Sequence, residues 1–499
     1  MKDQQRLLLS ASTALRSSLE LERRLYCIAS DGDSRRRAAL IKLTLCEKLP
    51  EGNQLFNTLS QLPLFNLLCG HDGLTCDFDW KHVFKRFRNT DLRKNGFSID
   101  HVLITIEIIR GQLLSLGLSS TTANSLLSPN DKQDVVLMIK LLSSISSLPE
   151  CDADERLTVI ATRRVLRLLG RVYFYLLHAY LNIELSLDEQ LTYLSAAAHL
   201  ILVLYHSNKG EFIPVQLYFD VMSMIKNVYF CVAKTQIDNP VAQFWIILLG
   251  TNGLEKVFGK VRTMVGSDTN ADQLQLANRI DGAVQCINIL EEHPEWGADS
   301  QRLTSKPLSN NPDSVSSKHD HINPKSWKGN VEVSRIVLES CWKEGRRKAV
   351  QVLTDAGLTA PFGMMDEKGG YDILCPFGGG KVILVNGKVD SAERDQTDEE
   401  ADVPDEPELQ ATSVPLDAMD MEPDLDDLAG TAEISTAQAI QPQNSKYEPW
   451  ISVKTSDKDS QLKKIHKSSI LRLYSSPLAT IDSKDRLKRV RGYSQFNDT

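Results

Sequence analysis

The 499 residues of the chain exceed what one hydrophobic core usually serves, so two or three structural units with linkers are expected. Hydrophobic residues make up 42% and charged residues 24%, as in globular proteins, and the most apolar runs are well short of the ~20 residues that cross a bilayer. The net charge of −8 is unevenly distributed: residues 390–427 are strongly acidic and contain one basic residue, Arg394, whereas the tail after Lys446 is rich in Lys and Arg.

The nine cysteines are scattered along the chain and form no Cys-x-x-Cys pair. An odd, unclustered set is typical of reduced thiols rather than of a disulfide framework, and it gives no support for a zinc finger. We therefore expect an intracellular protein with no membrane partner. Basic clusters at residues 463–467 and 486–491 are typical of nuclear-localisation signals, but they also occur in tails without that role, so nucleus and cytoplasm both stay open.

The first segment, residues 1–97, has the pattern of an α/β unit. Apolar residues recur at helical spacing over residues 4–24, and residues 35–49 form a second helical pattern. Between them, the short apolar run 25–30 predicts a buried strand, which the polar triplet Asp31-Gly32-Asp33 closes. A helix, a strand and a helix in this order form one unit of an α/β fold.

Residues 98–235 have an almost entirely helical pattern. Successive segments place apolar residues at intervals of three and four, and polar turns separate several of them. Amphipathic helices joined by short connections predict an all-α domain. The predicted helices span residues 99–116, 132–148, 155–181, 187–205 and 214–233.

Residues 236–297 return to a mixed pattern. A second short apolar run covers residues 244–249. A helix follows over residues 254–262, with Glu255 in its first turn, and another helix is predicted over residues 272–290. The strand-like run and the helices after it resemble in kind the pattern of the first segment.

The remaining segments are less regular. Residues 298–389 predict a polar linker, a helix over 331–356 and a β-hairpin over 370–389, with Gly378-Gly379-Gly380 in its turn. Residues 390–499, an acidic segment followed by the basic tail, have the composition of disordered chain.

Three local patterns carry chemistry, and the first is the carboxylate that follows the predicted strand 25–30. An Asp at the end of a buried strand can hold a divalent cation, because the fold fixes its backbone while its side chain reaches a cleft. Asp31 has this position. Asp-Gly is also a common turn pair, and on its own a turn is the more frequent explanation.

The second pattern is a basic helix that begins near Asp79. Asp79 can cap the helix, whose apolar residues face the core. The cations along it could lie against a phosphate backbone, where Lys and Arg dominate affinity without reading sequence. The alternative is a solvated basic face, which spacing alone favours. The cations are Lys81, Lys85, Arg86 and Arg88.

The third pattern is the helix that starts near Leu254. Glu255 lies in its first turn, and Lys256, Lys260 and Arg262 follow, so a metal ligand would stand next to cations that bind phosphate. The alternative is complementarity with the helix dipole, since Glu is favoured in a first turn in any case.

Taken in order, the three patterns resemble DDE transposases of the P-element (THAP-related) and hAT type. In those families a large helical insertion interrupts an RNase H-like catalytic fold. Asp31 resembles the second catalytic Asp of the families. Their helix motif is matched by Asp79, His82, Lys85, Arg88 and Asn89, and their Glu motif by Leu254, Glu255, Phe258, Gly259, Arg262, Gly266 and Asn270.

The resemblance implies a mainly α protein: a partial RNase H-like α/β core (residues 1–97 and 236–297), interrupted by an all-α insertion domain (98–235), with a disordered acidic then basic C-terminal region. It implies that Asp31 and Glu255 are the catalytic residues and the ligands of Mg²⁺. The residues it implies for DNA-backbone binding are Lys81, His82, Lys85, Arg86, Arg88, Lys256, Lys260 and Arg262.

The sequence departs from the families upstream of Asp31, where a strand with the first catalytic Asp finds no room. The resemblance therefore predicts an N-terminally truncated transposase relative that binds the DNA backbone, holds Mg²⁺ weakly and lacks strand cleavage and transfer. The alternative is a non-enzymatic helical scaffold or nuclear interaction protein. Its acidic segment, with the acidic and hydrophobic texture of residues 419–428, would bind protein partners. Self-association is left open.

Overall fold

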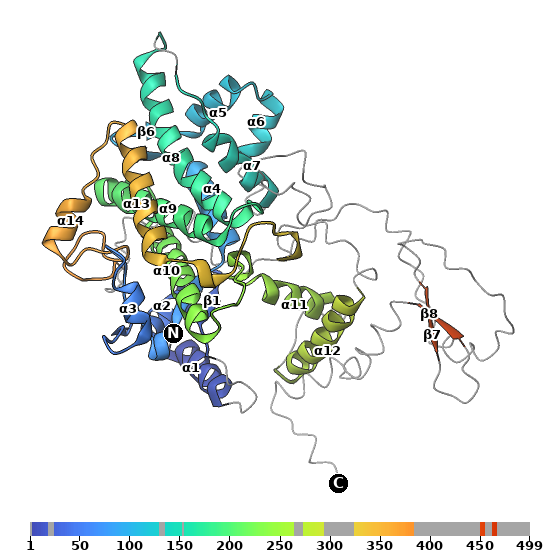
Figure 1. Ribbon diagram of the computed structural model, residues 1–499. Helices are drawn as coiled ribbons and strands as arrows, with labels where there is room; N and C mark the ends of the chain where they lie inside the picture. Colours follow the sequence, from blue (N-terminus) through green and yellow to red (C-terminus); the bar gives the residue numbers. More distant parts are fainter. Residues whose placement is uncertain are drawn as a thin grey trace. The chain divides into compact units, whose positions relative to one another are not determined.

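The chain divides into two compact units, residues 1–252 with 301–402 and residues 253–300 with 403–499. Helices dominate the described residues, as the sequence predicts (Figure 1). No helix in the described ranges is long and apolar enough to span a bilayer. The computed structural model describes residues 2–17, 24–128, 135–151, 154–263, 273–293, 324–383, 450–454 and 462–466.

The N-terminal elements confirm the predicted helix, strand and helix. Asp33 is the N-cap of the second helix, and its side chain accepts a hydrogen bond of 2.9 Å from the backbone N–H of Arg36. The helix therefore begins directly after the strand. The elements are α1 (Lys2–Ser17), β1 (Cys27–Ser30) and α2 (Ser34–Thr44).

β1 pairs in parallel with β4 (Thr75–Phe78), so the carboxyl ends of both strands meet at the same edge. β4 leads directly into α4 (Trp80–Asp91), which Asp79 caps. Asp31 and Asp79 thus each follow one strand of the parallel pair. The crossover between the strands contains α2, β2 (Glu47–Lys48), α3 (Gln54–Leu59), β3 (Leu68–Cys69) and η1 (His71–Gly73).

Every sheet within the described ranges has two strands. The RNase H-like core that the resemblance implies is therefore not confirmed beyond the parallel pair. The prediction of one helix over 99–116 is wrong at its start, where β5 (Phe97–Ile99) and β6 (Val102–Ile104) form an antiparallel hairpin. Its two turn residues, Asp100 and His101, adopt φ values of 50° and 61°, a left-handed pair that closes a hairpin and stops a helix.

The predicted helical pattern of residues 98–235 is otherwise confirmed, and a separate insertion domain stays a prediction. The last two helices of this segment, α9 (Leu187–Asn208) and α10 (Val215–Asp238), are buried on all faces along most of their length, so they form its centre. The last helix also packs on β4, α3 and α4, which joins the helical domain to the parallel strands. The helices are α5 (Ile106–Ser115), α6 (Ser120–Leu126), α7 (Val135–Ser146), α8 (Leu157–Leu181), α9 (Leu187–Asn208) and α10 (Val215–Asp238), with η3 (Lys209–Glu211) between the last two.

Helix α13 (Leu338–Asp355) confirms the core of the helix predicted over 331–356 and packs along α9, far from it in the sequence (Figure 1). Gly345 permits this close packing, because a Cβ atom there would lie 2.4 Å from the side chain of Ser195. The shorter elements around it are η4 (Ile246–Leu248), η8 (Pro324–Ser326), η9 (Val333–Arg335) and α14 (Phe362–Lys368).

The β-hairpin predicted over 370–389 is wrong for the described residues 370–383. They form turns with a single bridge between Asp372 and Cys375. Gly378, Gly379 and Gly380 all have positive φ, which ends any extended strand before a ladder can form. Residues 384–389 and the predicted linker 298–317 lie outside the described residues.

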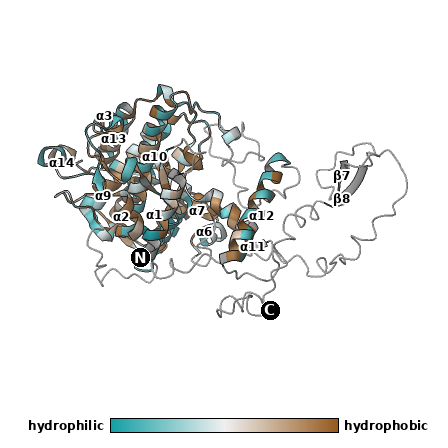
Figure 2. Ribbon diagram, turned by 90° about the horizontal axis from the view of Figure 1, so that it is seen from below, coloured by the Kyte–Doolittle hydropathy of each residue, from teal (hydrophilic) through white to brown (hydrophobic). Residues whose placement is uncertain are grey.

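The second unit contains α11 (Asn252–Thr263) and α12 (Gln273–Glu292), close to the predicted bounds. Both helices contain hydrophobic and hydrophilic residues along their length (Figure 2). Several of their large apolar side chains are exposed, among them Leu254, Phe258 and Leu274. The predicted disorder of 390–499 is wrong for one part, since β7 (Trp450–Lys454) and β8 (Leu462–His466) form an antiparallel pair. The rest of that segment lies outside the described residues.

Candidate functional site at the ends of two parallel strands

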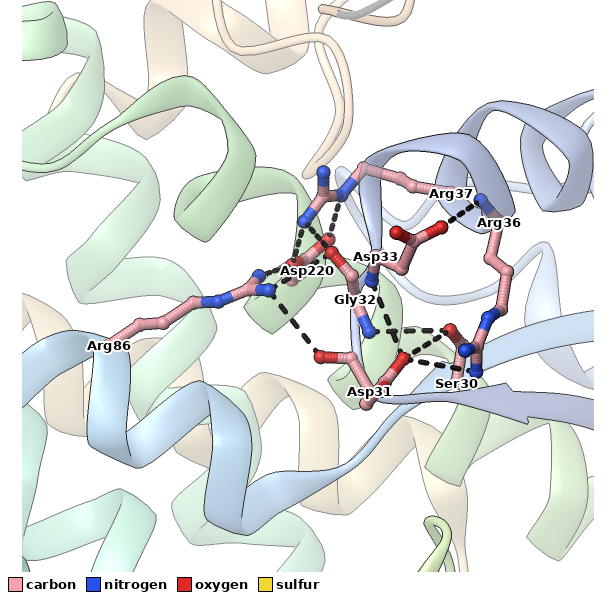
Figure 3. A network of polar contacts seen from close by, with 8 residues as sticks. All are labelled: Ser30, Asp31, Gly32, Asp33, Arg36, Arg37, Arg86 and Asp220. Atoms are coloured by element: carbon pink, nitrogen blue, oxygen red, sulfur yellow. Dashed lines mark hydrogen bonds and ion pairs between the residues drawn. The ribbon is translucent and has the colours of Figure 1, made fainter. Parts of the chain in front are cut away.

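Asp31 lies where the sequence predicts it, immediately after β1. Its side chain is 38% exposed, and its Oδ1 lies 3.3 Å from Nη1 of Arg36, on the first turn of α2 (Figure 3). The hydroxyl of Ser30 donates a hydrogen bond of 3.3 Å to the same oxygen. The carboxylate is thus already paired with a guanidinium group from its own loop and helix.

The backbone carbonyls of the same loop also face guanidinium groups. The Gly32 carbonyl accepts hydrogen bonds from Nη2 of Arg37 at 2.6 Å and from Nη2 of Arg86 at 3.0 Å. Gly32 has φ of 91°, and a Cβ atom there would lie 2.6 Å from the Arg86 guanidinium. The positive φ therefore favours glycine, and a larger residue would also displace the Arg86 guanidinium from the Gly32 carbonyl.

A buried carboxylate, Asp220 of α10, holds the two guanidinium groups together (Figure 3). Asp220 is fully buried, and Arg37 donates to it through Nε and Nη2 at 2.8 and 2.9 Å. Arg86 of α4 also donates to Asp220. This network joins α2, α4 and α10 around the carboxyl end of β1.

The network is balanced in charge. It contains three carboxylates (Asp31, Asp33, Asp220) and three guanidinium groups (Arg36, Arg37, Arg86). A Mg²⁺ site gathers oxygen ligands with an excess of negative charge, whereas a cation at this loop would meet three guanidinium groups. Within the described ranges, no group of three or more His, Cys, Asp or Glu side chains could share a metal ion. The loop around Asp31 therefore supplies no excess of negative charge for the Mg²⁺ that the resemblance implies.

Asp79, after the second strand, has a positioning role that the sequence only partly predicts. Its Oδ1 accepts the N–H of Lys81 at 2.9 Å, as a helix cap. Its Oδ2 accepts the N–H and the hydroxyl of Thr251, at 2.8 and 3.2 Å. Gly250, with φ of 97°, brings its backbone so close that a Cβ atom would lie 2.5 Å from Oδ2. Asp79 therefore anchors the residues that precede α11.

Asp77 is a second buried carboxyl group on β4. It is 1% exposed, and neither of its side-chain oxygens has a hydrogen-bond partner. Burial, followed by the nearby Cys27 thiol and the Asp79 carboxylate, raises the pKa of Asp77 well above its usual range. The N–H of Gly250 opposes this shift without reaching hydrogen-bond geometry. Asp77 is therefore favoured in its neutral form.

The expectation that the cations of α4 lie on an exposed surface is wrong for two of them. Lys81 is 8% exposed, and Arg88 is fully buried, where it donates to the carbonyls of Leu126 and Ser128 at 3.2 Å each. The reason is that α4 packs against both α7 and α10, so more than one of its faces is covered. His82 and Lys85 are half-buried, and DNA binding by α4 stays a prediction.

Glu255 lies in the first turn of α11, as predicted, and its side chain is half-buried. Asp31 belongs to the first unit and Glu255 to the second, so the convergence of the two carboxylates stays a prediction. The side chains of Lys256, Lys260 and Arg262 lie outside the described residues.

Arg37, Asp220 and Thr251 complete these contacts and were not singled out from the sequence. Asp220 carries a sequence signal, because it is a lone acidic residue within the apolar run 217–225 of α10. A charged residue is rarely fully buried unless it is paired, so its place within the run indicates a partner. Nothing in the sequence indicates which partner.

No family model and no curated protein matches the chain. Among solved structures, the fold is similar to a chain of the Drosophila P element transposase strand transfer complex, with 15% sequence identity and a TM-score of 0.38. The match covers 54% of this chain and 62% of that chain, less than two thirds of its length. The chain is thus similar to a transposase at a distance that assigns it to no family.

Proposed function

We propose that the chain is a transposase-derived protein that binds the DNA backbone and has no strand-cleavage or strand-transfer activity. The proposal of its origin rests on the ordered motifs around Asp31, Asp79 and Glu255. The single observation that carries the loss of activity is the charge balance at the end of β1, where the guanidinium groups of Arg36, Arg37 and Arg86 equal in number the carboxylates of Asp31, Asp33 and Asp220.

The physical argument concerns phosphoryl transfer by two metal ions. That chemistry needs carboxylates that bridge and flank ions about 3.5–4 Å apart. Two unit charges of the same sign repel by roughly 4 kcal/mol at about 4 Å near a protein surface. Arg36 is the guanidinium group that pairs with Asp31, so it would repel a divalent cation at that carboxylate, and the balanced network around it supplies no excess of negative charge to offset this repulsion.

The test uses the purified full-length chain with labelled duplex oligonucleotides and a supercoiled plasmid, in the presence of Mg²⁺ or Mn²⁺. We expect nicking and joining no greater than those of the Asp31→Asn and Glu255→Gln variants. Metal-dependent cleavage that both substitutions abolish would overturn the loss of activity.

The second candidate is a non-enzymatic helical scaffold, which one observation favours. The cations Lys81, Arg86 and Arg88, expected on a DNA surface, contact groups within the protein instead. DNA binding that is tight at low salt and steeply lost with added salt supports the first function, because phosphate contacts release counterions. No DNA binding at any salt concentration supports the scaffold.

A further inference from the structure

A groove between α8 and α13 lies away from the ends of the parallel strands. Both helices pack along α9 and touch one another only lightly, which leaves a cavity of about 740 Å³ between them. Its apolar lining includes Leu148, Leu168 and Val352. Its acidic lining residues are Glu150 and Asp355, and its cationic ones are Arg163, Arg164, Arg167, Arg171, Arg347 and Lys348.

The cations form rows on the two walls. Arg164, Arg167 and Arg171 follow one another at intervals of three and four on α8, so they lie on one face about one helical turn, ~5.4 Å, apart. Arg347 and Lys348 supply charge from α13. The groove therefore presents positive charge repeatedly along its length and from both sides.

The counter-charges in the groove are easily displaced. Arg164 pairs with Asp100 at 2.7 Å and Arg167 with Glu150 at 2.9 Å, and the Asp100 and Glu150 side chains are 35% and 79% exposed. Arg347 donates two hydrogen bonds of 2.7 Å to Glu344, which also lies 3.6 Å from Nζ of Lys348, and the Arg347 and Glu344 side chains are 67% and 40% exposed. Exposed ion pairs contribute about 0–1 kcal/mol, so an incoming anion can replace them at little cost. The ion pair of Arg37 with Asp220 differs from these pairs, because both of its side chains are buried.

Two of the arginines are held in place before any ligand arrives. The guanidinium of Arg171 lies 4.9 Å from the ring centroid of Phe174 and 5.2 Å from that of Tyr175. Arg163 is 7% exposed and donates to Ser115 Oγ at 2.6 Å and to the carbonyl of Pro149 at 3.2 Å. Side chains that are already ordered lose less conformational entropy when a ligand binds.

We propose that this groove binds the phosphodiester backbone of a nucleic acid. Apart from the buried Arg163, arginine supplies four of the five cations that line the groove, and a guanidinium group donates two parallel hydrogen bonds to a phosphate. The arginines repeat along α8 at about one helical turn, and such a row suits the regularly repeated charges of a phosphodiester backbone better than the irregularly placed carboxylates of a peptide. The proposal rests on the proposed function, because DNA binding is the reason to name a nucleic acid as the ligand. It assigns this binding to the groove between α8 and α13 instead of to α4.

The test measures binding of a labelled oligonucleotide to the full-length chain by fluorescence anisotropy, over about 50–200 mM salt. The triple variant Arg167→Gln, Arg347→Gln, Lys348→Gln should bind at least about tenfold more weakly at low salt. The slope of log K against log salt should become less negative by about 2–3, since each lost phosphate contact removes about 0.7–0.9.

A matched control carries the same loss of charge outside the groove. Lys94, Lys328 and Lys368 are exposed and do not line the cavity. The triple variant Lys94→Gln, Lys328→Gln, Lys368→Gln should bind within about twofold of the wild type, because overall charge acts weakly at screened distances. Thermal unfolding of both variants confirms that each is folded.

Three results would overturn the inference. If the wild type binds with a strong salt dependence and the groove variant binds equally well, the groove is wrong and the proposed function stands. If the wild type binds no nucleic acid at any salt concentration, both are wrong. If a polyglutamate peptide binds as tightly as the oligonucleotide and loses binding in the same variant, the groove accepts acidic proteins instead.

Discussion

Arg37 and Asp220 lie 183 positions apart and form a buried ion pair with two hydrogen bonds, at 2.8 and 2.9 Å. Arg37 lies near the N-terminus of α2, and Asp220 lies within α10. Because Asp220 also accepts from Arg86 of α4, this one carboxylate holds the helical domain against the loop that carries Asp31. Its removal tests how much the arrangement depends on charge.

The substitution Asp220→Asn should lower the free energy of unfolding by about 3–5 kcal/mol, because it leaves buried guanidinium charge without its carboxylate. Urea unfolding measures the change. The matched control is Glu339→Gln, which removes an exposed pair with Lys343 and should cost about 0.3–0.5 kcal/mol. Equal effects of the two substitutions would show that the network contributes no more than a surface pair.

Millimolar Mg²⁺ should change the Tm of the wild type no more than NaCl of equal ionic strength does, because the loop around Asp31 carries as many guanidinium groups as carboxylates. The Asp31→Asn variant should behave identically, with a change in stability within about 1 kcal/mol, as for other exposed ion pairs. Differential scanning calorimetry compares the two proteins. A rise in Tm that is specific to Mg²⁺ and absent from the variant would contradict the charge-balance argument.

Gly250→Ala should destabilise the protein by about 1–3 kcal/mol, the usual cost of a strained backbone or a forced contact. Its φ is 97°, and the new Cβ would lie 2.5 Å from Oδ2 of Asp79. Gly253→Ala is the control, because that Cβ meets nothing within 4 Å and alanine favours the helix by about 0.5–1 kcal/mol. If both variants are as stable as the wild type, Asp79 does not anchor the start of α11.

Asp91 predicts a pH dependence of stability. Burial raises its pKa to about 8, although the Tyr173 hydroxyl donates a hydrogen bond of 2.8 Å to it and opposes the shift. Since the folded pKa lies above the unfolded value of about 3.9, the folded state binds the proton more tightly. The stability that this group contributes is therefore complete below about pH 4 and is lost as the pH rises to 8.

The variant Asp91→Asn keeps an acceptor for Tyr173 and removes the titration. Urea unfolding at about pH 5 and about pH 8 should show that the variant gains stability relative to the wild type as the pH rises. A difference between the two proteins that is the same at both pH values would mean that Asp91 titrates normally in the folded state.

Much of the local structure could be predicted because it depends on near neighbours along the chain. The periodic apolar residues of α8, α9 and α10 are sufficient to define long helices. A short apolar run is not sufficient to define a strand, because the run 25–30 contains β1 whereas the strand-like run 244–249 contains the 3-10 helix η4. The hairpin of β5 and β6 could not be predicted in the same way, because it depends on the left-handed conformation of Asp100 and His101.

The charged residues of α4 show most clearly which features depend on the local sequence and which depend on tertiary packing. The sequence by itself determined that α4 is an amphipathic helix with Asp79 at its start and cations along it. Only the tertiary structure decided that Arg88 is buried on carbonyl groups, that Arg86 joins Arg37 on Asp220, and that an exposed row of arginines lies on α8 instead. Spacing shows which side chains share a face of a helix, but the segments packed on that face, here distant in sequence, determine whether a charge meets water or a carboxylate.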